Sequence, residues 1–82
     1  MTSRDVVVNV VHDTERRMAE LVSLAGEFQS RIHLAYNEKR INAKSIMGVM
    51  TLVSYSGDSI TVTADGADET EAVEAISQFF AG

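Results

Sequence analysis

The sequence predicts a small two-layer α/β domain, on three observations. With 82 residues, folding buries only about 60 to 65% of the unfolded surface, which leaves room for one core. Hydrophobic residues make up 45% of the chain, as in a globular domain and unlike a disordered tail. Strand-like and helix-like patterns are interleaved, with no proline and no low-complexity segment between them. We therefore expect one domain over residues 1–82.

The chain opens with a strand and a helix. Residues 5–11 (DVVVNVV) are continuous and β-branched, which favours a strand covered on at least one face. Asp13 or Thr14 can accept hydrogen bonds from the first turn of a helix, and apolar residues then recur at helical spacing. This pattern predicts a helix over about residues 15–27.

A hairpin follows the first helix. Residues 31–36 (RIHLAY) alternate between apolar and mainly polar side chains, which is the period of a half-buried strand. Asn37 and Glu38 supply a short polar turn into a second strand that begins at residue 39.

The second half of the chain predicts two helices separated by a strand. Ser45 is placed to cap a short helix over about residues 46–53. Residues 59–65 alternate with Ile60, Val62 and Ala64 inward, so they predict a strand. A last helix is expected from Asp68 to Phe80, with acidic residues in the first turn, where the helix dipole favours them. The predicted order is β-α-β-β-α-β-α.

The short second helix is more apolar than one buried face requires. Val49, with Leu52 and Val53, forms one arc, and Ile46, Met47 and Met50 form its neighbour. Two interpretations remain open at this point. Either the helix is deeply buried, or one arc packs on the sheet while the other stays accessible for adaptable methionine contacts with a partner.

Charge and composition exclude several classes of protein. The net charge of −5 argues against a nucleic-acid-binding module, and the absence of cysteine excludes thiolate chemistry and zinc-thiolate sites. No apolar run is long enough for a membrane span, and residues 1–11 lack a signal-peptide pattern, so we expect a cytoplasmic protein without a membrane partner. Basic residues concentrate mid-chain, whereas residues 56–82 carry only acids, which would favour a protein partner or a phosphate group.

The segments KSIMGVM and SGDSITVTADGADETEAVEAI closely resemble the HPr family of phosphocarrier proteins of the bacterial phosphotransferase system. The similarity runs from about Phe28 to the end. It implies an α+β fold, an open-faced β-sandwich in which a four-stranded antiparallel sheet of order 1-4-2-3 is covered on one face by three helices. It also implies a bacterial protein that is not an enzyme and needs no cofactor or metal.

The family carries phosphate on a histidine at the start of its first helix, in a G-hydrophobic-H-A-R-P-A segment. The corresponding stretch here is HDTERRMA, which puts Thr14 at the histidine position, keeps Arg16 and replaces the proline by Arg17. A threonine cannot replace the histidine as a phosphate carrier, because a threonine phosphate ester lacks the high transfer energy of a phosphoramidate. His12 is the remaining candidate for a phosphocarrier accepting phosphate from enzyme I, although Asp13 and Glu15 would repel a phosphoryl group. The other histidine, His33, is interpreted as a surface residue.

The second phosphorylation site of the family is retained. Its serine, modified by HPr kinase/phosphorylase, matches Ser45 within an intact segment. The family binds catabolite control protein A through residues that match Ile46, Met47, Met50 and Arg16. The paralogue Crh likewise lacks the histidine and keeps the serine, although it retains the A-R-P-A segment. Arg17 is expected to compensate in part, since guanidinium groups pair well with phosphoserine.

Three functions are therefore considered. The first is a regulatory HPr-like protein of carbon catabolite repression, phosphorylated on Ser45 and lacking the carrier histidine. The second is a phosphocarrier using His12, and the third is an interaction module that is not phosphorylated. The β-branched first strand could also pair with a second copy, so a monomer or a weak homodimer is expected.

Overall fold

The computed structural model describes residues 1–8, 14–36, 38–51 and 57–81. The described elements follow the predicted order β-α-β-β-α-β-α. They are β1 (Thr2–Val7), α1 (Thr14–Gly26), β2 (Arg31–Tyr36), β3 (Lys39–Asn42), α2 (Ile46–Met50), β4 (Ser59–Asp65) and α3 (Glu69–Ala81).

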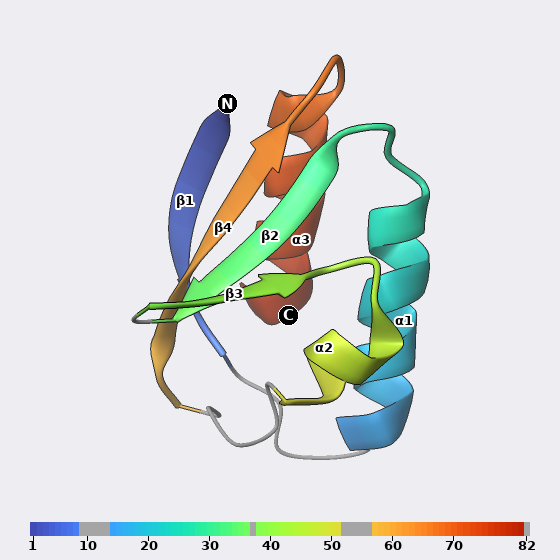
Figure 1. The fold of residues 1–82 in the computed structure, drawn as a ribbon, viewed down its shortest axis with the longest axis vertical. Coiled ribbons are helices and arrows are strands. Elements are labelled where there is room, and N and C mark those ends of the chain that lie inside the picture. The colour runs from blue at the N-terminus through green and yellow to red at the C-terminus, as the bar shows by residue number, and fades with distance from the viewer. Residues whose placement is uncertain (9–13, 37, 52–56, 82) are drawn as a thin grey trace.

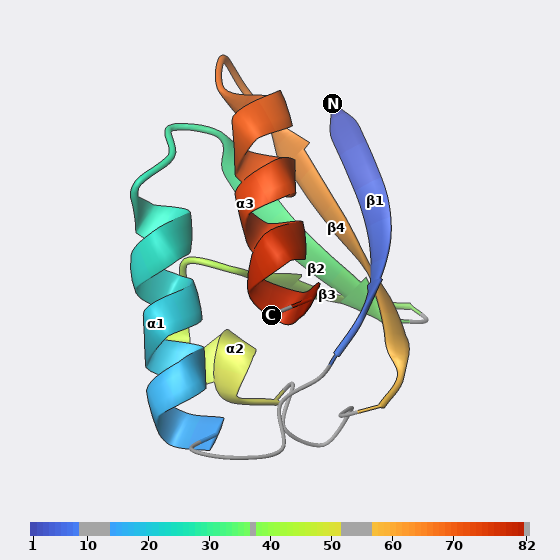
Figure 2. The same cartoon turned by 180° about the vertical axis from the view of Figure 1, so that it is seen from behind.

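The four strands form one antiparallel sheet in the order β1-β4-β2-β3. The helices lie on one face of this sheet (Figures 1 and 2). Helix α3 packs on β1, β4 and β2, and α1 packs beside it, while α2 contacts α1 and β3. No described helix covers the other face. The expected open-faced α+β sandwich is confirmed.

The hydrophobic core lies between the sheet and the helices. Alternate residues of β2 and β4 point into it, as the two-residue period predicted, and one stripe of each long helix closes it. Val22, Phe28, Tyr36 and Phe79 are only partly buried and pack against the edge of this core. Its buried residues include Ile32, Leu34, Ile60, Val62 and Ala64 of the sheet, Met18, Leu21 and Ala25 of α1, and Val73, Ile76 and Phe80 of α3.

The first strand starts earlier than the predicted residues 5–11. Thr2 pairs with Ala64 and Val7 with Ser59, so β4 provides partners for the polar residues that precede the apolar run. The backbone ladder with β4 therefore extends the strand over residues 2–4, which carry no apolar pattern of their own. Residue 8 follows the strand, and residues 9–11 of the prediction lie outside the described residues.

The helices begin close to their predicted positions. Helix α1 lies within one residue of the predicted 15–27, and α3 starts at Glu69, directly after Asp68. Helix α2 is shorter than predicted, because it ends at Met50 with Thr51 as its C-cap. Residues 52 and 53 of the predicted helix lie outside the described part of the chain.

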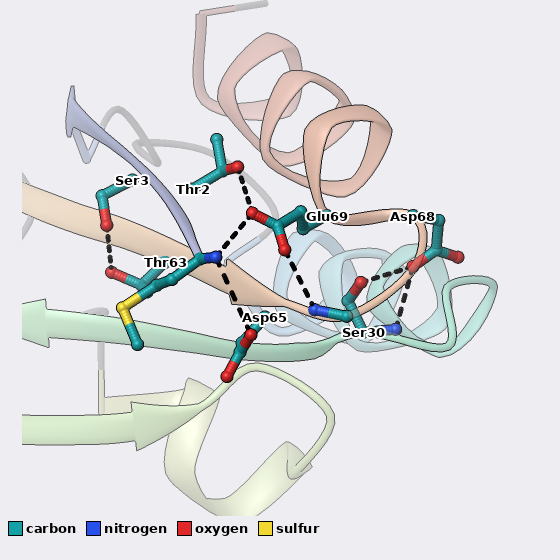
Figure 3. Close-up of polar contacts among 9 residues, drawn as sticks. Thr2, Ser3, Ser30, Thr63, Asp65, Asp68 and Glu69 are labelled. Atoms are coloured by element: carbon teal, nitrogen blue, oxygen red, sulfur yellow. Dashed lines mark hydrogen bonds and ion pairs between the residues drawn. The ribbon is translucent and has the colours of Figure 1, made fainter.

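A network of polar contacts joins the loops at one end of the molecule (Figure 3). The buried Ser30 hydroxyl donates to Asp68 at 2.5 Å, and the Ser30 N–H donates to the same carboxylate oxygen at 2.9 Å. The neighbouring Glu69 accepts from the Thr2 hydroxyl at 2.5 Å and pairs with the Met1 ammonium at 2.8 Å. We call these five residues the polar cluster.

The polar cluster lowers the pKa of both of its carboxyl groups. The Ser30 hydroxyl, and then the Gln29 N–H, lower the pKa of Asp68. Hydrogen bonds from the Met1 ammonium and then from Thr2 lower the pKa of Glu69 to about 2. The hydrogen bond to Glu69 in turn raises the pKa of the ammonium group. Each group is thus stabilised in its charged form.

Gly66 allows the loop before α3 to contact the loop after α1. A Cβ atom at this position would lie 2.6 Å from Ser30 Oγ and 2.7 Å from Ser30 Cα. Both distances are shorter than van der Waals contact, so only glycine fits without movement of the backbone.

Candidate functional site

Helix α2 starts from a well-defined turn after β3. The N–H of Lys44 donates to Asn42 Oδ1 at 2.9 Å, and the N–H of Ser45 donates to the Asn42 carbonyl at 3.0 Å. Ser45 has an extended backbone (φ −108°, ψ 115°), and its Oγ accepts from the N–H of Gly48 at 3.4 Å. The predicted N-cap role of Ser45 is confirmed.

One side of α2 anchors it to the core. Val49 is fully buried, and its N–H donates to the Ser45 carbonyl at 2.9 Å. Gly48 lets the helix approach β3, because a Cβ there would lie only 3.1 Å from Ile41 Cγ2. The Thr51 hydroxyl donates to the Gly48 carbonyl at 2.6 Å and so helps to close the last turn.

The other side of α2 is exposed. Met47 is 83% exposed and Ile46 is 45% exposed, which makes them two of the four large apolar side chains exposed on the described part of the chain. Met50 differs from them, because it is half-buried and packs against the core. The interpretation of α2 as a deeply buried helix is therefore excluded for Ile46 and Met47.

The two arginines at the start of α1 have different environments. Arg16 is 78% exposed and makes one ion pair, at 3.3 Å, with Glu20. Arg17 is held against α3, since it donates to the Phe79 carbonyl at 3.0 Å and its guanidinium lies 4.1 Å from the Phe79 ring centroid. Arg17 would have to leave these contacts to pair with a phosphate, whereas Arg16 would give up only a surface ion pair.

Thr14, the residue predicted to stand at the position of the family histidine, is the first residue of α1 and is half-buried. Its hydroxyl can form a phosphate ester but no phosphoramidate. The alternative carrier residue, His12, and its neighbour Asp13 lie outside the described residues. Glu15, also in the first turn of α1, is exposed.

His33 lies on the side of β2 that faces away from the core and is half-buried. It has no carboxylate partner among the described residues. No group of three His, Asp or Glu side chains that could hold a metal ion occurs in the described ranges. No helix in these same ranges is long and apolar enough to span a bilayer.

The structure also brings together basic residues that the sequence pattern did not single out. Arg31 and His33 of β2 line one pocket with Asn42 and Lys44. The alternation of RIHLAY places Arg31 and His33 on one face, but nothing local indicates that Lys44 joins them.

Comparison with known proteins agrees with this architecture. A family model described as the PTS HPr component phosphorylation site matches residues 2–82. The phosphocarrier protein HPr of Cupriavidus necator is 40% identical over 77 residues, covering 93% of this chain and 86% of that protein.

Solved structures agree as well. The crystal structure of HPr from Bacillus anthracis is 35% identical, with a TM-score of 0.86, and the match covers 96% of this chain and 95% of that one. Crh of Bacillus subtilis, a catabolite repression protein whose crystal structure shows a swapped dimer, is 34% identical, with a TM-score of 0.76 and coverage of 93% and 84%. HPr is a phosphocarrier protein and not an enzyme. Because the family model matches residues 2–82 and a phosphocarrier protein HPr is 40% identical over 93% of this chain, the chain belongs to the HPr family of the phosphotransferase system.

Proposed function

We propose that this HPr-family protein is regulatory, that it is phosphorylated on Ser45 and that it acts through protein contacts. The contacts are made by a docking surface that consists of Ile46, Met47, Met50 and Arg16. One observation carries the proposal: a capping hydroxyl directly precedes Ile46 and Met47, whose side chains are 45% and 83% exposed. A modifiable group and an apolar contact surface thus lie side by side.

A phosphate on Ser45 is compatible with the fold. It would add a charge of about −1.5 to −2 at the end of a helix where backbone N–H groups and the helix dipole favour an anion. The Gly48 N–H already donates to this side chain, and Val49 holds the helix to the core independently of it. The modification would therefore change the charge beside Met47 and leave the packing of α2 in place.

Family resemblance supplies the partners of the proposal. HPr kinase/phosphorylase would modify Ser45, and catabolite control protein A would bind the phosphorylated docking surface. The similarity to Crh, a catabolite repression protein, supports this assignment. Arg16 is the more available of the two predicted charge partners, because it makes only an exposed ion pair with Glu20, whereas Arg17 is engaged with Phe79.

Phosphocarrier activity through His12 is the alternative, and the 40% identity to a phosphocarrier protein favours it. It requires a slip of the register before α1, since Thr14 is the residue predicted to stand at the position of the family histidine. An interaction module without any phosphorylation is the third candidate.

Two labelling reactions separate these functions. With ATP and HPr kinase/phosphorylase, mass spectrometry should show one phosphate on the wild type and on Ser23→Ala, which removes an exposed serine of α1, but none on Ser45→Ala. Label that persists on Ser45→Ala would contradict the proposal. With enzyme I, an acid-labile phosphate that is lost in His12→Gln would instead support the carrier.

Binding to the repressor tests the docking surface. Calorimetry with the phosphorylated protein should show affinity about tenfold lower for Met47→Ala, because we expect Met47 to be a hot spot, and truncating a hot spot costs more than about 1 kcal/mol. Val7→Ala, at an exposed apolar residue of the edge strand β1, should bind as the wild type does. Equal binding by Ser45→Ala and Ser45→Asp would favour the interaction module.

A further inference from the structure

A pocket of about 320 Å³ lies beside the start of β2 and the end of β3. Its lining consists of Arg31, Ile32, His33, Asn42 and Lys44. The side chain of Ile32 is buried, so this residue contributes mainly backbone, and the four polar residues supply the chemistry.

The fold explains why these residues meet. Arg31 and His33 alternate with the buried Ile32, so they lie on the face of β2 that the helices leave open. His33 is paired with Asn42 in the sheet, and beyond this pair one backbone hydrogen bond, from the Ala43 N–H to the Ile32 carbonyl at 3.0 Å, still joins the two segments. The turn that leads to α2 then places Lys44 beside Arg31, which has no β3 residue opposite it.

The polar side chains of this pocket present hydrogen-bond donors. Lys44 Nζ donates to the Phe28 carbonyl at 2.7 Å, and this bond holds it in place while two N–H groups remain. The Oδ1 of Asn42 is occupied by the N–H of Lys44, which leaves the amide NH₂ to donate. Within the described part of the chain, the side chains of Arg31 and His33 have no hydrogen-bond or ion-pair partner.

No acidic side chain lines the pocket among the described residues. The nearest carboxylate in register is Asp65, opposite Arg31, and it lies 3.8 Å from the Met1 ammonium. Two cations and an imidazole thus share one small space in a chain whose net charge is −5. Like charges repel each other in such a space unless an anion is bound between them.

We propose that this pocket binds the phosphate dianion of a small molecule, either inorganic phosphate or a phosphate monoester. A tetrahedral phosphate presents several acceptor oxygens at once, so it can accept from the planar guanidinium of Arg31 and from Lys44 together. The Asn42 amide and the His33 ring supply further donors. A carboxylate has only two oxygens and would leave some of these donors unpaired.

This proposal does not rest on the phosphorylation of Ser45. The hydroxyl of Ser45 belongs to the cap of α2, and it is not part of the pocket lining. The Ser45→Ala variant should therefore bind phosphate as the wild type does, even if the regulatory function proposed above is wrong.

Titration by NMR tests the pocket directly. Inorganic phosphate is added to the full chain at constant ionic strength, with chloride as the compensating anion. Saturable shifts should appear at the His33 ring and the Asn42 side-chain amide. Arg31→Gln and Lys44→Gln should each weaken binding about tenfold or more, the cost of losing a charge-assisted hydrogen bond.

The matched control is Arg40→Gln, which removes an exposed cation of β3 outside the pocket lining. It should leave the affinity within about twofold, since Arg40 does not line the pocket and would donate no hydrogen bond to the bound phosphate. Equal weakening by Arg40→Gln and Arg31→Gln, or shifts that chloride reproduces, would overturn the proposal. Folding of each variant is verified by its amide spectrum.

A second arm identifies the source of the phosphate group. Glycerol phosphate is titrated alongside inorganic phosphate under the same conditions. Tighter binding of the ester would assign the pocket to a phosphorylated metabolite, and tighter binding of inorganic phosphate would assign it to the free ion. If Arg31→Gln weakened the binding of neither ligand, the proposed site would be refuted.

Discussion

The polar cluster and the docking surface differ in how their side chains are satisfied. In the polar cluster, buried Ser30 and the carboxylates of Asp68 and Glu69 find hydrogen-bond and ion-pair partners within the chain. On the docking surface, Met47 is 83% exposed and contributes little to the core. The polar cluster stabilises the fold, whereas the docking surface keeps apolar area available for contact with another molecule.

The residues that stabilise the fold and the residues proposed to bind a partner are thus different ones within one small protein. Changes in the polar cluster or in the anchoring side of α2 should lower the free energy of unfolding. Changes at Met47 or Arg16 should leave that free energy nearly unchanged and affect only the binding of a partner. Each variant below tests one side of this division.

The largest loss of stability is expected for Gly66→Ala. The added methyl would lie 2.6 Å from Ser30 Oγ, so the two loops must separate at a cost of about 2 to 3 kcal/mol, as in overpacked cores. Gly26→Ala is the control, because a Cβ there meets nothing within 4 Å. Urea denaturation should show a lower midpoint for Gly66→Ala alone. Equal midpoints for the two variants would mean that the loops are not in tight contact.

The next largest difference in the free energy of unfolding is expected between alanine variants of two residues of α2. Val49→Ala opens a cavity in the core and should cost about 2 kcal/mol, whereas Met47→Ala should stay within about 0.5 kcal/mol of the wild type. Thermal unfolding of both proteins measures the difference. A marked destabilisation by Met47→Ala would show that this side chain serves the fold, and the docking surface would lose its main member.

Stability should also fall in acid because of the polar cluster. The lowered pKa of Asp68 and Glu69 means that their contribution is complete above the ordinary carboxyl pKa of about 4. It is lost as the pH falls toward 2, the approximate pKa of Glu69. The ammonium group of Met1, with its raised pKa, contributes fully below pH 8.0 and loses its contribution as the pH rises through the raised value.

Glu69→Gln should therefore flatten the urea midpoint as a function of pH between about pH 5 and 2. Glu71→Gln, at an exposed glutamate in the same helical turn, should leave the slope unchanged. If the two variants give the same slope, Glu69 does not carry the acid sensitivity of this region.

The smallest effect is expected for the arginines of α1. Arg17→Gln removes the contact with the Phe79 ring and should cost about 0.5 to 1 kcal/mol. Arg16→Gln breaks only a surface ion pair and should cost less than about 0.5 kcal/mol. Partner affinity should show the reverse order, with the larger loss for Arg16→Gln. The opposite pattern in binding would make Arg17 the phosphate partner.

Much of the fold could be predicted from local patterns, and the errors have identifiable causes. The alternation of β2 and β4 and the cap at Ser45 were correct, because both depend on neighbouring residues. The start of β1 was missed, since Thr2 and Ser3 become strand residues only through their pairing with β4. Met50 is half-buried against the core, which helical spacing alone could not show, and its role in the docking surface stays a prediction.

The order of the elements and the capping role of Ser45 were determined by the sequence alone. The match of Thr14 to the family histidine stays a prediction. Periodicity, caps and motif residues act over a few positions, so they can be read along the chain. Only the tertiary structure decided that Met47 stays exposed, that Arg17 contacts Phe79 and that Lys44 joins Arg31 in one pocket. These contacts join residues far apart in the chain, and their geometry exists only once the sheet and helices have packed.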